Sequence, residues 1–337
     1  MNNSDGSLLL TNCTFHGNKA GSGGAIYGLS TGTKIYNTIF ADNSATYKTD
    51  SKDMYFYIPA VTTGNSTIGE LVNCRFDSDG SNDGSKIIST DCTTAAPLFL
   101  TASPDINGGP VPTLAISAGG SAFRSGVKPG TEISGDFKTP LTDARGVSFD
   151  TAHADMGAYA YVLESANASV KTDAPKELII GTSADISKVF SLEAHLKDTP
   201  SPDAYAAAFN FASSASDVIS ADNGAMYILK KGVSDVSVTS AKGKKSDGSE
   251  VTFSGITHNI KTYVSAASFD ISEKSREIAR GGSAVFSIVI PSGYTSADIE
   301  SRDISWSLTG TGYTITPSSD GLSAKVAANY DSFAKSS

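Results

Sequence analysis

Acidic residues gather in one short stretch, DSDGSND, that spans residues 77–83. Two carboxylates that face a cleft act as general acid and general base in polysaccharide hydrolysis. The spacing of Asp77, Asp79 and Asp83 also fits a calcium loop, although the later Glu of an EF-hand loop is missing. The third interpretation is a solvated Asp/Gly turn that needs no ligand. These three residues are the candidate metal ligands, Ca²⁺ is the candidate ion, and we expect no other cofactor.

Aromatic residues gather in a second stretch, MYFYI, which spans residues 54–58. Tyr55, Phe56 and Tyr57 are the candidate binding residues, because exposed rings can stack on sugars or form an apolar contact patch. The same side chains could instead fold back into a core. Both interpretations remain open at the level of the sequence.

Other catalytic patterns are missing from the chain. His16, His153, His195 and His258 are widely spaced, and no nucleophile elbow, P-loop, zinc-protease or dinucleotide fingerprint occurs. No Lys-Arg pair of the kind used by polysaccharide lyases stands beside the acidic stretch. We therefore expect no catalytic residues and no enzymatic activity, with a polysaccharide lyase or glycoside hydrolase as the alternative.

A repeat near the N-terminus indicates which elements must position these residues. Its units share an apolar–x–Asn–Cys/Thr–x–Phe pattern, and their asparagines are spaced by 25 and then 36 residues. Such a period is typical of a solenoid, in which equivalent residues stack about 4.8 Å apart. The matching positions are Asn12, Asn37 and Asn73; Cys13, Thr38 and Cys74; and Phe15, Phe40 and Phe76. The repeat predicts a buried Phe column and an Asn ladder, with inserted residues 46–63 on one face.

The three cysteines, Cys13, Cys74 and Cys92, do not form a zinc motif or a disulfide framework. Cys13 and Cys74 would lie two coil spacings apart, about 9.6 Å, whereas a disulfide needs Cα atoms within about 7 Å. We therefore expect this pair to stay unbonded.

Two motifs carry a family resemblance. The segments Phe15-His16-Gly17-Asn18 and Gly23-Gly24-Ala25-Ile26 resemble the FxxN and GGAI motifs of chlamydial polymorphic outer-membrane proteins and of other bacterial surface β-helices. The resemblance implies a right-handed parallel β-helix of the pectate-lyase type, without pectate lyase activity. It also implies export. Because the first 25 residues hold no signal peptide, we expect upstream sequence to be missing.

The segment 96–161 resembles the end of choice-of-anchor Q β-helix proteins. It contains Pro97-Leu98-Phe99, then Asp143-Ala144-Arg145-Gly146, and finally Asp155-Met156-Gly157-Ala158-Tyr159. The resemblance implies a structural segment that caps the open end of the solenoid and partly buries Met156 and Tyr159.

From about residue 164 the pattern changes to alternating strands with short turns. Residues 218–240 resemble the bacterial Ig-like group 2 signature, with a hairpin at Asn223-Gly224. A second unit starts near residue 265, with Trp306 expected on its third strand and Phe209 or Phe211 at that place in the first unit. The predicted fold class is all-β: the C-terminal part of a right-handed parallel β-helix over 1–163, an Ig-like β-sandwich over 164–264, and a second, incomplete one over 265–337.

The composition of the chain limits the classes of partner that it is expected to bind. The chain has 337 residues, of which 18% are charged, and a net charge of −9. An acidic chain is a poor partner for nucleic acid or an anionic membrane, and no apolar run is long enough for a membrane span. The family resemblance implies an extracellular or cell-surface protein that binds a host or microbial glycan or protein. A purely structural stalk is a further alternative.

Overall fold

The structure is a computed structural model that describes residues 2–3, 7–28, 32–47, 49, 52–56, 67–77, 86–152, 154–199, 201–264, 270–299 and 304–329. Regular structure in these ranges consists of β-strands and three short 3₁₀ helices, so the expected all-β class is confirmed. No helix within them is long and apolar enough to cross a membrane.

The chain divides into two compact units, which are described separately. Unit 1 contains Met1–Ser169, Phe190–Asn210 and Val238–Ile256, and unit 2 contains Val170–Val189, Phe211–Ser237 and Thr257–Ser337. The division follows spatial contacts and crosses several strands. The boundaries expected at 163/164 and 264/265 stay predictions.

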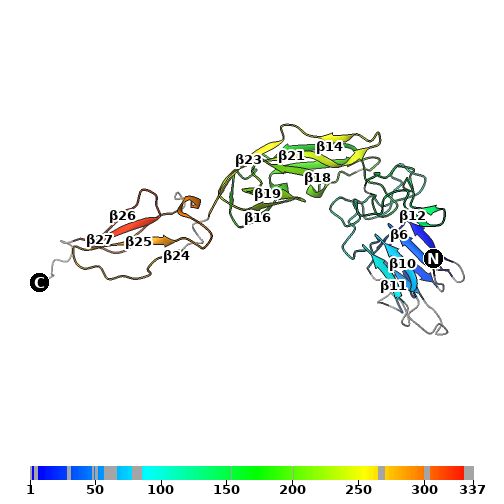
Figure 1. Ribbon diagram of the computed structural model, residues 1–337, viewed down its shortest axis with the longest axis horizontal. Helices are drawn as coiled ribbons and strands as arrows, with labels where there is room; N and C mark the ends of the chain where they lie inside the picture. The colour runs from blue at the N-terminus through cyan, green and yellow to red at the C-terminus, as the bar shows by residue number, and fades with distance from the viewer. Residues whose placement is uncertain are drawn as a thin grey trace. The chain divides into compact units, whose positions relative to one another are not determined.

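Short parallel strands from successive turns of the chain stack on one another in unit 1 (Figure 1). In the longest column Leu10 pairs with Ile35, and Ile35 pairs with Leu71. Equivalent residues of successive turns, here called coils, therefore lie side by side. The columns are β2 (Leu9–Thr11), β6 (Thr33–Tyr36), β10 (Thr67–Val72) and β11 (Lys86–Thr90); β1 (Asn2–Asn3), β5 (Ile26–Gly28) and β9 (Met54–Phe56); β3 (Thr14–His16) and β7 (Ile39–Ala41); and β4 (Lys19–Ala20) and β8 (Ser44–Ala45).

The stack encloses an apolar core. Phe15 and Phe40 stack with ring centroids 5.1 Å apart and an interplanar angle of 4°, and Phe40 is fully buried. Phe76 is partly buried and packs against the same cluster, which also contains Ile35 and Leu71. The predicted stack is confirmed for Phe15 and Phe40, whereas full burial is confirmed for Phe40 alone, because Phe15 and Phe76 are only partly buried.

The asparagines of the repeat stand where the chain turns between strands. Asn12, Asn37 and Asn73 have φ values of 48°, 50° and 48°, in the left-handed region that Asn tolerates better than most residues. Asp91 has a φ of 51° at the corresponding point after β11. The sequence analysis missed this fourth unit because Asp replaces Asn there, and no Phe follows at the matching position.

The Asn ladder forms only in part. Asn37 Nδ2 donates to Asn12 Oδ1 at 3.3 Å, as predicted for neighbouring coils. Asn73 Nδ2 donates instead to the carbonyl oxygen of Ser125 at 2.8 Å. The amides therefore bind the later part of the chain as well as one another.

The Gly23-Gly24 motif lies where two coils approach closely. A Cβ atom added to Gly24 would lie 2.3 Å from the carbonyl oxygen of Lys52 and 2.8 Å from that of Ser44. No larger side chain fits there without moving backbone. The motif therefore has a packing role.

The rest of unit 1 contains a long, mostly irregular segment, residues 94–161, and several strands of the chain that follows it. Phe209, expected in a sandwich core, is buried and its ring centroid lies 6.1 Å from that of Phe253. The regular elements are β12 (Glu132–Ser134), β13 (Phe137–Lys138), β14 (Val162–Val170), β17 (Phe190–Leu196), η2 (Ala206–Ala208), β18 (Phe209–Ser213), β21 (Gly232–Lys245) and β22 (Glu250–Thr252), of which β14, β18 and β21 continue into unit 2.

Unit 2 contains the predicted hairpin. Asn223 and Gly224, with φ values of 45° and 87°, join two antiparallel strands. Its elements are β15 (Glu177–Ile179), β16 (Ser183–Asp185), η1 (Ile186–Lys188), β19 (Ile219–Asp222), β20 (Ala225–Ile228), β23 (Thr257–Tyr263), β24 (Asp270–Ile271), β25 (Ser283–Val289), η4 (Ser296–Asp298), β26 (Tyr313–Pro317) and β27 (Ser323–Ala328).

Trp306 corrects one expectation. Residues 304–309 form no strand, so the prediction that Trp306 lies on a third strand is wrong. The partly buried indole donates from Nε1 to the carbonyl oxygen of Gly321 at 2.8 Å. Gly321 lies in the turn between β26 and β27, so the indole of this irregular segment is bonded to that turn.

Replacing Phe40 by Ala should lower the free energy of unfolding by about 3–5 kcal/mol, because the ring is fully buried and a cavity remains. Urea unfolding followed by circular dichroism measures the loss; the single tryptophan, Trp306, lies in unit 2 and does not report on this core. Phe137→Ala is the control, since Phe137 is 49% exposed. Equal losses for both variants would contradict the assignment of Phe40 to the core.

Candidate functional site

The candidate metal ligands are only partly described. Asp77 Oδ1 accepts a hydrogen bond from Arg75 Nη2 at 2.6 Å, and the Asp77 N–H donates to the Asp53 carboxylate. Asp79 and Asp83 lie outside the described residues. No group of three or more metal-binding side chains occurs in the described ranges. The calcium site stays a prediction, and the described contacts of Asp77 are those of an ion pair.

The candidate aromatic residues lie in and after β9. Tyr55 is 7% exposed, and its ring centroid lies 5.6 Å from that of Tyr27 on the neighbouring coil. Met54 is fully buried. The side chain of Phe56 and all of Tyr57 lie outside the described residues. Of the two interpretations of this stretch, Tyr55 follows the core one, and its ring offers no stacking surface to a ligand.

Arg75 is an important residue that the sequence analysis missed. Its side chain is 8% exposed, and Nε, Nη1 and Nη2 donate to the Ala95 carbonyl, the Phe40 carbonyl and Asp77 respectively. Buried arginine keeps its charge and needs this many acceptors. The signal in the sequence was an arginine at a repeat position where other coils have Thr14 and Ile39.

A groove of about 470 Å³ runs beside Arg75. It is lined by residues of three neighbouring segments: His16 of β3, Ala41 and Asp42 at the end of β7, and the chain from Ala96 to Ala102. His16 Nε2 lies 3.0 Å from Asp42 Oδ2. The His16 ring meets the Phe99 ring edge-on, with centroids 5.5 Å apart and an angle of 89°.

The groove side chains are accessible to different degrees. The Asp42 side chain is 77% exposed, whereas that of His16 is 22% exposed. Asp42 stands in a left-handed turn with a φ of 55°, and residues 97–99 line the same groove. The arrangement offers a charged hydrogen-bond acceptor, an imidazole and an aromatic ring to one ligand. No motif flagged Asp42 or Phe99 in this role, because only the coil-to-coil register brings them together.

A second cleft of about 480 Å³ lies elsewhere in unit 1. Lysines 197, 244 and 245 line it together with Asp150 and Asp198. Lys244 Nζ lies 4.0 Å from Asp150 Oδ1, so part of the positive charge is already neutralised. The mixture of charges favours no single class of ligand.

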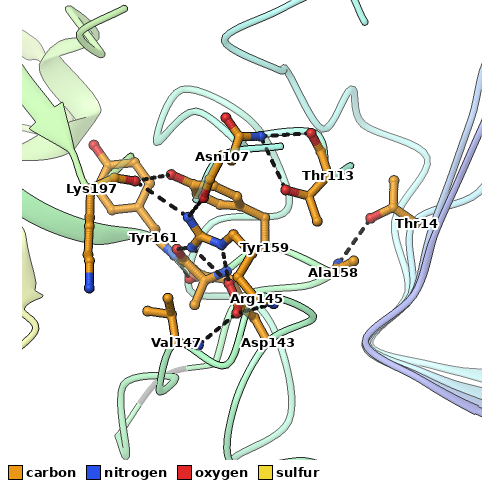
Figure 2. A network of polar contacts seen from close by, with 12 residues as sticks. Thr14, Asn107, Thr113, Asp143, Arg145, Val147, Ala158, Tyr159, Tyr161 and Lys197 are labelled. Carbon is orange, nitrogen blue, oxygen red and sulfur yellow. Dashed lines mark hydrogen bonds and ion pairs between the residues drawn. The ribbon is translucent and has the colours of Figure 1, made fainter. Parts of the chain in front are cut away.

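A buried ion pair stands at the centre of the irregular segment (Figure 2). The side chains of Arg145 and Asp143 are 1% and 0% exposed, and Arg145 Nη2 lies 2.7 Å from Asp143 Oδ2. Asp143 also accepts backbone N–H groups from Arg145, Val147 and Ala160 at 2.8–2.9 Å. Arg145 donates to the Ala160 carbonyl at 2.8 Å and covers the Tyr159 ring, with Cζ 3.7 Å from its centroid.

The chemistry of this pair is structural. Every Asp143 contact fixes the path of residues 143–160, and burial raises the pKa of Tyr159 to about 12. Neither charge is accessible to a ligand. The Asp-x-Arg-Gly element therefore stabilises the fold of this segment, in agreement with the structural role expected for it.

The Asp155 segment lies against the side of the coil stack. Asn12 Nδ2 donates to the Asp155 carbonyl at 3.2 Å, and the Gly157 N–H donates to the Asn37 carbonyl at 2.7 Å. A Cβ atom on Gly157 would lie 2.6 Å from the Ile39 side chain. Met156 and Tyr159 are each 1% exposed, which is more burial than expected. These bonds reach two neighbouring coils along the flank, so they do not cap an open end.

The Asp155 carboxylate is buried inside this segment. It accepts the N–H of Arg124 at 2.8 Å and that of Tyr161 at 2.7 Å. Burial raises the pKa of Asp155 to about 6, and the two N–H bonds limit the rise. His153, two residues earlier, lies outside the described residues.

Comparison with known proteins assigns the chain to no family. No protein-family model matches the chain, and no curated protein matches it significantly.

Replacing Arg145 by Met should lower the free energy of unfolding by about 3–5 kcal/mol, because Asp143 would keep a buried charge without its partner. The control is Arg276→Met, since the ion pair of Arg276 with Glu273 has side chains 49% and 45% exposed and should contribute almost nothing. Urea unfolding followed by circular dichroism measures both. If Arg145→Met lowered the free energy of unfolding no more than the control does, the stabilising role of the Arg145–Asp143 pair would be contradicted.

Asp155 should make stability depend on pH. Because its folded-state pKa of about 6 lies above the ordinary aspartate value of 3.8, the folded protein binds the proton more tightly. The stabilisation of the folded state by protonated Asp155 is complete below about pH 4 and is lost as the pH rises through about 6. Two pKa units correspond to about 3 kcal/mol.

The measurement compares wild type with Asp155→Asn by urea unfolding between about pH 4 and pH 7. The variant lacks the titrating group, so the stability of wild type relative to the variant should fall as the pH rises. Parallel curves would contradict a raised pKa for Asp155.

Proposed function

We propose that this chain is part of an exported bacterial surface protein that binds carbohydrate on the flank of a right-handed parallel β-helix, with Ig-like domains as spacers. The columns of parallel strands in unit 1 support the solenoid, as do the left-handed Asn turns. Antiparallel pairs after residue 164, such as β19 with β20 and β25 with β27, support the spacers. The localisation is extracellular or at the cell surface.

The observation that carries the binding function is the groove beside His16, Asp42 and Phe99. Its volume of about 470 Å³ lies in the usual range for small-ligand sites. Sugars present both apolar C–H faces and hydroxyl groups. An aromatic ring contacts the former, and a carboxylate accepts hydrogen bonds from the latter. Phe99 and Asp42 supply these two groups within one groove.

The net charge of the chain limits the class of glycan that the groove would bind. A net charge of −9 repels polyanions, so the proposal favours a neutral glycan over an acidic one. Asp42 adds to this preference, since its carboxylate is exposed at the groove. Host and microbial surfaces both present neutral glycans, and the groove chemistry is common to them.

The alternative is a polysaccharide-degrading enzyme, which the His16–Asp42 pair favours. A histidine oriented by a carboxylate can act as a general base. Arg75 would have to supply the positive charge that a lyase uses, yet Nε, Nη1 and Nη2 are all bonded within the protein. Among the described residues that line the groove, the one arginine is thus already bonded within the protein, and binding is the better-supported function.

The test is glycan-array binding by the full chain, followed by calorimetric titration with the best neutral ligand. Asp42→Asn and Phe99→Ala should each weaken binding about tenfold or more, which corresponds to loss of roughly 1.4 kcal/mol. Tyr227→Ala is the matched control, because Tyr227 is 50% exposed and lies on β20. Unchanged affinity in both groove variants would contradict the proposed site.

We expect no depolymerising activity on pectin, alginate or similar acidic glycans. The measurement is the appearance of new reducing ends or unsaturated products after incubation with the purified chain. Activity that disappears in Asp42→Asn or Asp77→Asn would overturn the binding proposal and establish the enzymatic alternative.

A further inference from the structure

Cys92 belongs to the same column of equivalent positions as Cys74. The pairs Val72 with Thr90 and Arg75 with Thr93 are in register on either side of the two cysteines. Cys74 and Cys92 are therefore opposite one another on neighbouring coils. The usual spacing of neighbouring strands, about 4.8 Å, falls within the Cα separation that a disulfide requires.

The sulfur atom of Cys92 lies close to the Cys74 backbone. The Cys74 N–H donates to Cys92 Sγ at 3.4 Å. Cys92 Sγ also lies 3.4 Å from the carbonyl oxygen of Thr90, and Cys74 Sγ lies 3.3 Å from that of Val72. Both side chains thus project from the same point of the turn, one above the other. Both are free thiols in this structure.

The two thiols differ in reactivity. Cys74 is fully buried, and burial raises its pKa. Cys92 is partly exposed, and the hydrogen bond with the Cys74 thiol lowers its pKa. The thiolate is the form that attacks a disulfide. Cys92 is consequently the thiol that an external oxidant meets first, and Cys74 is the partner that completes the bond.

We propose that Cys74 and Cys92 are a redox-active pair that closes a disulfide between neighbouring coils. The oxidant is a low-molecular-weight disulfide, such as oxidised glutathione, or the active-site disulfide of a thiol oxidoreductase. The inference rests on the register and the thiol contacts, and it is independent of the carbohydrate groove.

The reaction proceeds in two exchange steps. The Cys92 thiolate attacks one sulfur of the oxidant, which breaks the oxidant's S–S bond, forms a mixed disulfide and releases one thiolate. Cys74 then loses its proton and attacks the Cys92 sulfur, which releases the second thiolate. The two released thiolates take up the protons that the cysteines lost. Overall, two protein thiols are oxidised and one disulfide is reduced to two thiols.

Cys13 is a built-in control within the same column. Thr38 separates it from Cys74: the Cys13 N–H donates to Thr38 Oγ1 at 3.5 Å, and the Arg75 N–H donates to the Thr38 carbonyl at 3.0 Å. Two strand spacings, about 9.6 Å, exceed the range for a disulfide. Cys13 should therefore stay reduced under conditions that oxidise the other two cysteines.

The experiment uses the full chain treated with oxidised glutathione. Thiol titration in denaturant should fall from the three thiols of the reduced chain to one. Mass spectrometry of a non-reduced digest should show Cys74 and Cys92 in linked peptides, with Cys13 free. Reduction by dithiothreitol should restore all three thiols and lower the thermal unfolding midpoint, because the cross-link restricts the unfolded chain.

Cysteine variants distinguish the two thiol–disulfide exchange steps. Cys13→Ser should form the link as wild type does. Cys74→Ser should stop at a glutathione adduct on Cys92, since the second step lacks its nucleophile. Glutathione retained on Cys92 of wild type, a link that involves Cys13, or three unreacted thiols would each overturn the proposal. The wild-type result alone decides between these outcomes if a variant fails to fold.

Discussion

The coil stack depends on one constraint, a left-handed residue at the turn that follows each strand of the longest column. Asn12, Asn37, Asn73 and Asp91 all have φ near 50°. That conformation costs a typical L-residue about 1 kcal/mol or more, and Asn and Asp bear it best. Once the turn is set, the following strands stand in register: Phe15 pairs with Phe40, and Arg75 pairs with Thr93. The Phe core, the groove and the cysteine pair all follow from this register.

The segment after the coils uses a different kind of stabilisation. Residues 94–161 contain little strand, so their backbone groups cannot all be satisfied by ladders. Buried carboxylates take over part of this task. Asp143 accepts three backbone N–H groups and Asp155 accepts two. Asp203 is also fully buried and accepts the Tyr161 hydroxyl at 3.1 Å. Each charge is costly to bury, and these hydrogen bonds offset the cost.

The groove is formed by the join between these two systems. His16 and Asp42 come from the coil stack, whereas Phe99 comes from the segment that leaves it. Arg75 connects them, because it donates both to Phe40 within the stack and to Ala95 in the later chain. Arg75 also lines the groove, so one buried arginine bonds to both of the segments that form it.

The sequence by itself determined the all-β class, the repeat, the stacked pair of Phe15 and Phe40, and the hairpin at Asn223-Gly224. These depend on local periodicity and on the φ values that Asn and Gly allow, so neighbouring residues are sufficient to specify them. Only the tertiary structure decided that Tyr55 is buried, that Trp306 lies outside a strand, and that the Asp155 segment lies along the coils. It alone brought His16, Asp42 and Phe99 into one groove and Cys74 opposite Cys92. The fourth coil lacks the Asn and Phe of the other units, and the chain from Ala96 onward does not repeat. The sequence pattern therefore gives no register for the contacts of Cys92 and Phe99.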